Sequence, residues 1–190
     1  MKKIIVLTAI AAVLVFSGAA KADMDKLIFS EFGLSYGSVI DPSYISNNST
    51  GVFDTAVFDA KAGVEILKWA DVYAAAGFNL YLERKNWQAH YTFFPLAGGI
   101  RVNIMPDWCV YPVVFGEYGV SFSNQRTIVS PLADHNVPWI AKYYNFGIGV
   151  NWKVEDMATL CLTLERPSIS NIMGAEIHIL KAGLAWKILY

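Results

Sequence analysis

The sequence is poor in the residues that build metal and cofactor sites. Its 190 residues include three histidines and two cysteines, and none of them has the close spacing of a zinc site. It contains no glycine-rich phosphate loop, and its formal net charge of −1 offers no basic surface to nucleic acid. We therefore expect no metal, no cofactor and no nucleic-acid partner.

Long apolar runs are absent after the first 22 residues, although 55% of the chain is hydrophobic. A membrane-spanning helix needs about 20 consecutive apolar residues, so we expect no such helix in this part of the chain. The apolar residues instead recur at every second position, which is typical of β-strands with one apolar face.

Residues 1–22 have the parts of a secretory signal peptide. Two lysines precede an apolar run over residues 4–16, and Ala20-Lys21-Ala22 matches the small-x-small cleavage pattern. The apolar run is too short to span a membrane as a helix. Cleavage after residue 22 leaves one domain, residues 23–190, with 12 Lys and Arg against 16 Asp and Glu, a formal charge of −4.

Eight segments of alternating apolar and polar residues fill the remaining chain. We predict strands over residues 27–38, 55–68, 71–84, 90–105, 108–122, 142–154, 157–167 and 175–190. Their connections alternate between short and long, which is typical of a closed antiparallel barrel that crosses a membrane. The short connections are centred on Trp69-Ala70, Pro106-Asp107 and Glu155-Asp156, and the long ones cover residues 41–54, 85–89, 123–141 and 168–174.

Each predicted strand has one apolar face and one polar or glycine-rich face. A soluble β-sandwich, the alternative, would bury the apolar faces in a core, but here the polar faces carry charges from nearly every strand. This arrangement favours an all-β, eight-stranded antiparallel transmembrane barrel with lipid outside, short periplasmic turns and long extracellular loops. Pro95 and Pro112 fall inside two strands, where proline usually marks a bulge. Outward aromatic residues near the strand ends predict two interfacial belts: Trp69, Trp108, Trp152 and Trp186 on the turn side, and Tyr36, Phe94, Phe122 and Tyr144 nearer the loops.

The two cysteines, Cys109 and Cys161, both fall on the inward phase of strands that are separated by one other strand. A strand spacing of about 4.8 Å separates such residues by roughly 9–10 Å. Because a disulfide needs Cα atoms within about 7 Å, we expect two free thiols packed inside.

Charged residues from most strands share the inward phase and form the candidate functional site. An eight-stranded barrel is just wide enough for side chains to fill it, and buried charges are costly unless they are paired. We therefore favour a salt-bridged plug over a narrow charged pore or a gate, and a small ligand or a partly apolar lumen is the remaining alternative. The members are Glu31, Asp59, Lys61, Glu65, Glu83, Arg101, Glu117, Lys153, Glu165 and Lys181.

The C-terminal residues Leu184, Trp186, Ile188 and Tyr190 occupy every second position and are all apolar. This pattern resembles the C-terminal signal that the barrel-assembly machinery of bacterial outer membranes recognises. Together with the signal peptide and the turn alternation, it makes the whole mature chain resemble the small eight-stranded outer-membrane barrels of the OmpA/OmpX/OmpW type. The OmpX branch implies surface protein binding, and the OmpW branch implies passage of small hydrophobic compounds through a lateral opening.

A rim hydrolase, with serine, histidine and an acid at the outer strand ends, is a third alternative. His178 has Glu176 in its phase and Ser168 or Ser170 in reach, whereas His90 lacks a matching serine and acid. We expect no enzyme but a monomeric, cell-surface, structural or binding protein, with a porin-like pore or transporter as the alternative. Its expected partners are outer-membrane lipids, a lipid A-type glycolipid, the assembly machinery, and an extracellular protein or small solute.

Overall fold

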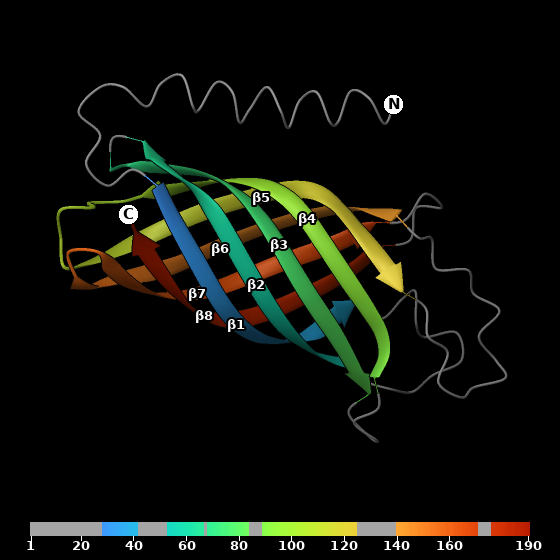
Figure 1. The fold of residues 1–190 in the computed structure, drawn as a ribbon. Helices are drawn as coiled ribbons and strands as arrows, with labels where there is room; N and C mark the ends of the chain where they lie inside the picture. The colour runs from blue at the N-terminus through green and yellow to red at the C-terminus, as the bar shows by residue number, and fades with distance from the viewer. Residues whose placement is uncertain (1–27, 42–52, 67, 84–88, 125–139, 171–175) are drawn as a thin grey trace, which may run out of the picture.

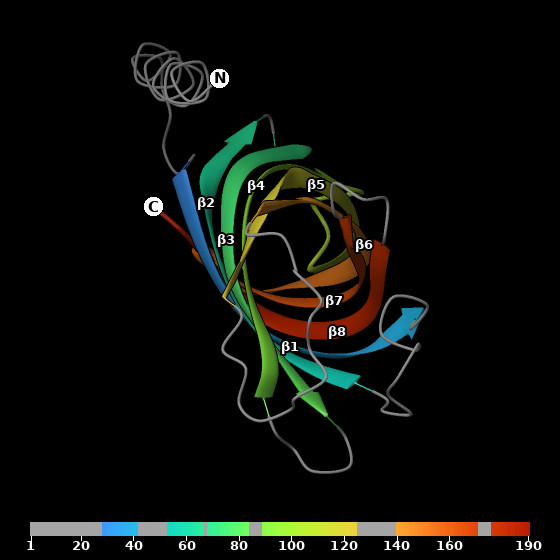
Figure 2. The ribbon, with the colours of Figure 1, turned by 90° about the vertical axis from the view of Figure 1, so that its right-hand side faces the viewer.

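The chain folds into a closed antiparallel barrel of eight strands, as predicted. The computed structural model describes residues 28–41, 53–66, 68–83, 89–124, 140–170 and 176–190. Each strand pairs with the next along the chain, and β1 also pairs with β8, which closes the barrel (Figures 1 and 2). The strands are β1 (Ile28–Asp41), β2 (Phe53–Ile66), β3 (Ala70–Glu83), β4 (Ala89–Asn103), β5 (Val110–Asn124), β6 (Ile140–Glu155), β7 (Ala158–Ser170) and β8 (Glu176–Leu189).

The antiparallel order gathers the connections at two ends. The turn end carries the start of β1, the end of β8 and the connections 67–69, 104–109 and 156–157. The loop end carries the connections 42–52, 84–88, 125–139 and 171–175. The two longest connections are both at the loop end. The alternation in length is weaker than expected, however, because the connection 104–109 is no shorter than 84–88 or 171–175.

The two strand prolines do not shift the register. Pro112 pairs opposite Val150 in an unbroken ladder, and its carbonyl accepts a hydrogen bond from the Ile104 amide at 2.9 Å. Around Pro95 and Gly77 the β3–β4 ladder has a gap, with the same register on both sides. Proline cannot donate to the ladder, and here two missing pairs replace the bulge that we expected. The register shifts lie elsewhere, near the strand ends at Val39/Asp41, Tyr81/Leu82 and Lys153/Glu155.

The two faces of the barrel wall differ in polarity. On β6 the outward Phe146, Ile148 and Val150 are exposed, whereas the inward Asn145 and Asn151 are fully buried. The four tryptophans predicted for the turn side are also exposed. Because apolar residues face out and polar residues face in, the barrel has the inverse of a soluble core. Among the described residues, no helix is long and apolar enough to cross a membrane.

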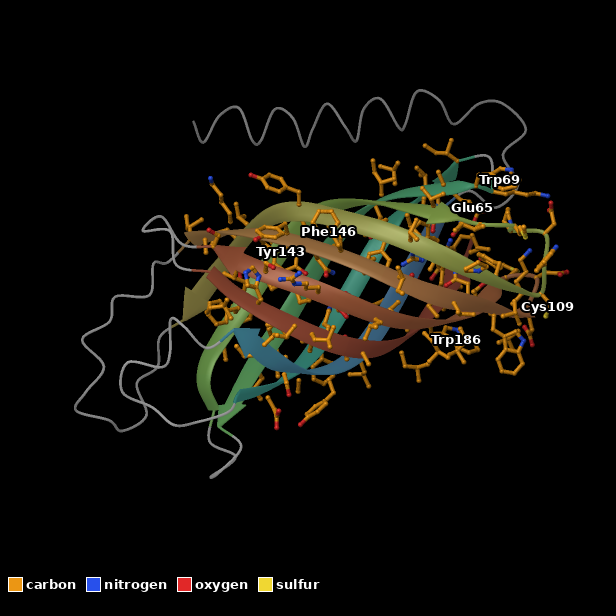
Figure 3. All side chains as sticks on the ribbon, turned by 180° about the vertical axis from the view of Figure 1, so that it is seen from behind. Glu65, Trp69, Cys109, Tyr143, Phe146 and Trp186 are labelled. Carbon is orange, nitrogen blue, oxygen red and sulfur yellow. The ribbon has the colours of Figure 1, made fainter. Side chains whose placement is uncertain are left out.

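Both cysteines are free, as expected, but only Cys161 is packed inside. The fifth strand begins at Val110, two residues later than predicted. Cys109 therefore lies in the preceding connection, where the strand alternation does not apply, and it is exposed at the turn end (Figure 3). The expectation of a packed thiol is wrong for Cys109.

Candidate functional site

The barrel interior holds a network of charged side chains, in which two groups of ion pairs are joined by the Asn145 amide. We call it the lumen network, and it combines six carboxylates with four cations from every strand except β6. Its charged members are Glu31, Asp59, Glu65, Asp71, Glu117, Glu165, Lys61, Arg101, Lys181 and Lys187.

Arg101, on β4, is the centre of the network near the turn end. Its Nη2 lies 2.7 Å from Glu31 Oε2 across the lumen, and its Nη1 lies 3.5 Å from Asp71 Oδ2. The rings of Tyr73 and Phe115 flank the guanidinium, with centroids 5.6 and 5.9 Å from its Cζ. A guanidinium suits this place because it is planar, always charged and able to bind carboxylates and stack on rings.

Glu117, on β5, is the second centre, at mid-height. Its Oε1 lies 3.0 Å from Lys61 Nζ and accepts a hydrogen bond from the Tyr73 hydroxyl at 3.1 Å. The Asn145 amide nitrogen donates to Glu117 at 3.0 Å and to Glu165 at 2.7 Å, so it joins two carboxylates of like charge. Multiple donors of this kind keep a buried carboxylate ionised.

Two lysines of β8 complete the network at different heights. Lys181 lies 2.9 Å from Glu165 and 3.6 Å from Asp59. Nearer the turn end, Lys187 lies 2.8 Å from Asp71 and 3.3 Å from Glu65. The two lysines therefore link β8 to its neighbour β7. Across the β1–β8 closure, they also link β8 to β2 and β3.

Eight of the ten residues predicted for the interior charge cluster belong to the lumen network. Lys153 is exposed at the turn end, and its amine contacts the Pro106 carbonyl and the Tyr111 ring. The side chain of Glu83 lies outside the described residues. Sequence reasoning missed Asp71 and Lys187, although both continue the inward phase of their strands.

Side chains fill the lumen around and above the network. Two voids lie against it, each about 10 Å³, which is room for roughly one water molecule. Toward the loop end an apolar layer follows, and it is built from Phe93, Ala141, Tyr143, Ile169, Ile177 and Ile179. Buried polar side chains lie beside this layer at the same height, because Asn79 pairs opposite Phe93 and Ser121 pairs opposite Ala141.

The predicted assembly signal lies at the closing edge of the barrel. Leu184, Trp186 and Tyr190 are exposed on the outward face. The Tyr190 amide donates to the Ile28 carbonyl at 2.8 Å, and its hydroxyl lies 3.0 Å from Ser30 Oγ. The last residue thus stays attached to the first strand while its ring remains available on the outer surface.

The serine and histidine weighed as rim catalysts do meet. Ser168 Oγ lies 2.7 Å from His178 Nδ1, and the strand register places Asp41 on the other side of His178. Ser168 is only 1% exposed, however, so its hydroxyl is not open to a substrate. The side chains of Asp41, Glu176 and His90 lie outside the described residues. Within the described ranges no group of three His, Cys, Asp or Glu side chains is placed to hold a metal ion.

Comparison with known proteins shows that this chain shares its fold with solved structures. No protein-family model matches the chain, and no curated protein matches its sequence. Among solved structures, Neisserial surface protein A (NspA) superposes with a TM-score of 0.60 at 10% identity, over 86% of this chain and 97% of that chain. Ail, the attachment invasion locus protein of Yersinia pestis, was solved in complex with the heparin analogue sucrose octasulfate. It superposes with a TM-score of 0.51 at 10% identity, over 88% of this chain and 100% of that chain. The chain has the fold of the small eight-stranded outer-membrane barrels.

Proposed function

We propose that the protein resides in an outer membrane and acts there as a structural or surface-binding barrel, without a catalytic role. The filled lumen carries this proposal. Ion pairs link strands on opposite sides of the interior, and an apolar layer covers them toward the loop end. Such an interior stabilises a closed wall and supports a sealed lumen.

Single-channel recording of the refolded protein in a planar bilayer tests this proposal. We expect a silent bilayer, with folding checked independently by heat-shifted gel mobility. The alternative function, a narrow pore for small solutes, predicts discrete steps that change when Arg101 or Glu117 is replaced. Such steps would overturn the sealed-lumen proposal. Lateral passage of a hydrophobic solute needs a separate uptake assay in vesicles, where we expect no difference from empty vesicles.

The loop end is the proposed binding surface, and an extracellular protein is the proposed partner. The predicted loops 41–54 and 123–141 contain the two longest connections, both of which lie outside the described residues. Ail, whose name describes attachment, has the same architecture. Deleting the tips of both loops should leave the heat-shifted barrel intact and abolish binding to host cells. Binding that survives the deletion would contradict a loop-borne function.

We also propose that residues 1–22 are removed on export and that the barrel-assembly machinery inserts the rest as a monomer. The intact mass of protein purified from outer membranes should correspond to a chain that begins at Asp23.

For the non-catalytic role, His178→Ala and His90→Ala should leave the acylation pattern of the membrane glycolipid unchanged. A pattern that differs from the wild type would assign the Ser168–His178 pair to chemistry.

A further inference from the structure

The outward face of the barrel becomes polar near the loop end of three neighbouring strands. On β7 the outward Leu162 and Leu164 are followed by Arg166 and Ser168. On β6 the outward Phe146 is followed by Tyr144 and then Lys142, and on β8 Leu180 gives way to His178. We call these polar residues the rim patch, and they are Lys142, Tyr144, Arg166, Ser168 and His178.

The strand register places the rim patch residues next to one another. Ser168 pairs with Tyr144 on one side and with His178 on the other, which makes a polar row across β6, β7 and β8. Lys142 is one outward position nearer the loop end than this row, and Arg166 is one position nearer the turn end. Four residues separate the two cations along the strands, roughly 13 Å at about 3.4 Å per residue. Both side chains are long enough to approach the row between them.

The two cations of the rim patch differ from those of the lumen network. Lys142 and Arg166 are both exposed, and the ion pairs found among the described residues all lie in the lumen and involve neither of them. The sequence does hold two carboxylates nearby, Glu176 and Asp41, which the register places on β8 and β1. Both cations of the patch therefore lie on β6 and β7, away from these two carboxylates on β8 and β1.

The position of the rim patch indicates the depth at which it meets a membrane. A charge on the lipid face of a barrel is costly at the bilayer midplane and almost neutral at the interface. The exposed Phe146 lies beside Arg166, and the exposed Ile148 and Leu164 lie below the patch, toward the turn end. A lipid whose head group contacts the cations can therefore lay its acyl chains on one continuous apolar surface.

We propose that the rim patch binds the phosphate group of a membrane lipid in the leaflet at the loop end. Lys142 and Arg166 supply the charge, and Arg166 offers paired donors to phosphate oxygens. The half-buried Tyr144 and His178 supply further hydrogen-bonding groups between them, and the buried Ser168 hydroxyl holds the His178 ring at 2.7 Å. A lipid phosphate fits better than a free anion, because only a lipid also uses the apolar face beneath the cations. The inference rests on the membrane placement proposed above and is independent of loop-borne binding.

The test compares two lipids with identical short acyl chains, phosphatidate and phosphatidylcholine, added to the refolded protein in non-ionic detergent. Native mass spectrometry measures the fraction of protein that carries each lipid. We expect the wild type to prefer phosphatidate by about tenfold, since charge-assisted hydrogen bonds are the strong ones. The double variant Lys142→Gln, Arg166→Gln should lose this preference, and the charge-conserving Lys142→Arg, Arg166→Lys should keep most of it.

A matched control removes two exposed lysines from the opposite end. The double variant Lys68→Gln, Lys153→Gln has the same change in net charge and should retain the wild-type preference. The proposal is overturned if the wild type shows no preference, if the two glutamine variants behave alike, or if excess inorganic phosphate abolishes the preference. A protein that fails to insert into vesicles would contradict the proposed membrane placement, whereas an inserted protein without phosphate preference contradicts this inference alone.

Discussion

Arg101 on β4 and Glu31 on β1 are 70 residues apart in the sequence, yet their side chains meet at 2.7 Å inside the barrel. These strands are not neighbours, so the contact crosses the lumen and does not follow the wall. Both side chains are almost completely buried. The pair needs β1 to β4 to be curled so that the first and fourth strands face each other, and it therefore reports on the curvature of the wall.

Replacing Arg101 with methionine should destabilise the barrel strongly. The substitution keeps a long apolar side chain between Tyr73 and Phe115 but leaves Glu31 and Asp71 with fewer partners in a buried place. Removing one partner of a buried ion pair typically costs about 3–5 kcal/mol. Urea unfolding of the protein refolded in lipid vesicles, followed by tryptophan fluorescence, measures the loss in the free energy of unfolding.

Arg166→Met is the control for this variant, because it removes an exposed outward guanidinium from the same barrel. It should change the free energy of unfolding far less. Adding Glu31→Gln to Arg101→Met should recover part of the lost stability, since the neutral amide relieves the uncompensated charge. Equal stability of Arg101→Met and the wild type would show that the lumen network contributes nothing to holding the barrel closed.

Two adjacent glycines of β4 should respond differently to the same substitution. A Cβ on Gly99 would lie 2.6 Å from the ring of Tyr73, which is held by its hydrogen bond to Glu117. A Cβ on Gly98 points outward and meets its nearest atom at 4.0 Å. Gly99→Ala should therefore cost about 1–3 kcal/mol through overpacking, and Gly98→Ala should be close to neutral. The same urea titration measures both, and similar losses would contradict the inward packing of Tyr73.

The alternation of residues predicts which face a side chain occupies, because successive residues of a strand point to opposite sides. Lys181 and Glu165 were placed in the lumen by that rule alone. Their 2.9 Å contact could not be predicted from the alternation. Which residues of two strands come to the same height depends on the tilt and stagger of the closed barrel. Strand ends limit the rule as well. Lys153 keeps its phase but lies at the turn end of β6, outside the network, and Cys109 precedes its strand altogether.

The two cysteines give a test of topology. Cys109 is exposed at the turn end, whereas Cys161 is buried in the lumen near Glu31. A bulky membrane-impermeant maleimide should add one label to the folded protein and two after unfolding, as read from the intact mass. On cells, labelling should require permeabilised outer membranes if the turn end faces the periplasm, as the sequence predicts. Cys109→Ser should abolish labelling of the folded protein, and a label on intact cells would place the turn end outside.

The terminal residue should matter for assembly more than for stability. The ring of Tyr190 is exposed, and its only side-chain hydrogen bond among the described residues is the 3.0 Å contact with Ser30 Oγ. The backbone bond from its amide to the Ile28 carbonyl does not depend on the side chain. Tyr190→Ala should therefore leave the urea midpoint of the refolded barrel nearly unchanged while it lowers the amount of heat-shifted barrel in the outer membrane. Ser30→Ala separates the two effects, because it removes the hydrogen bond and keeps the aromatic ring. If Ser30→Ala reduced the assembled barrel as much as Tyr190→Ala, the tyrosine would act through that bond and not as a signal to the assembly machinery.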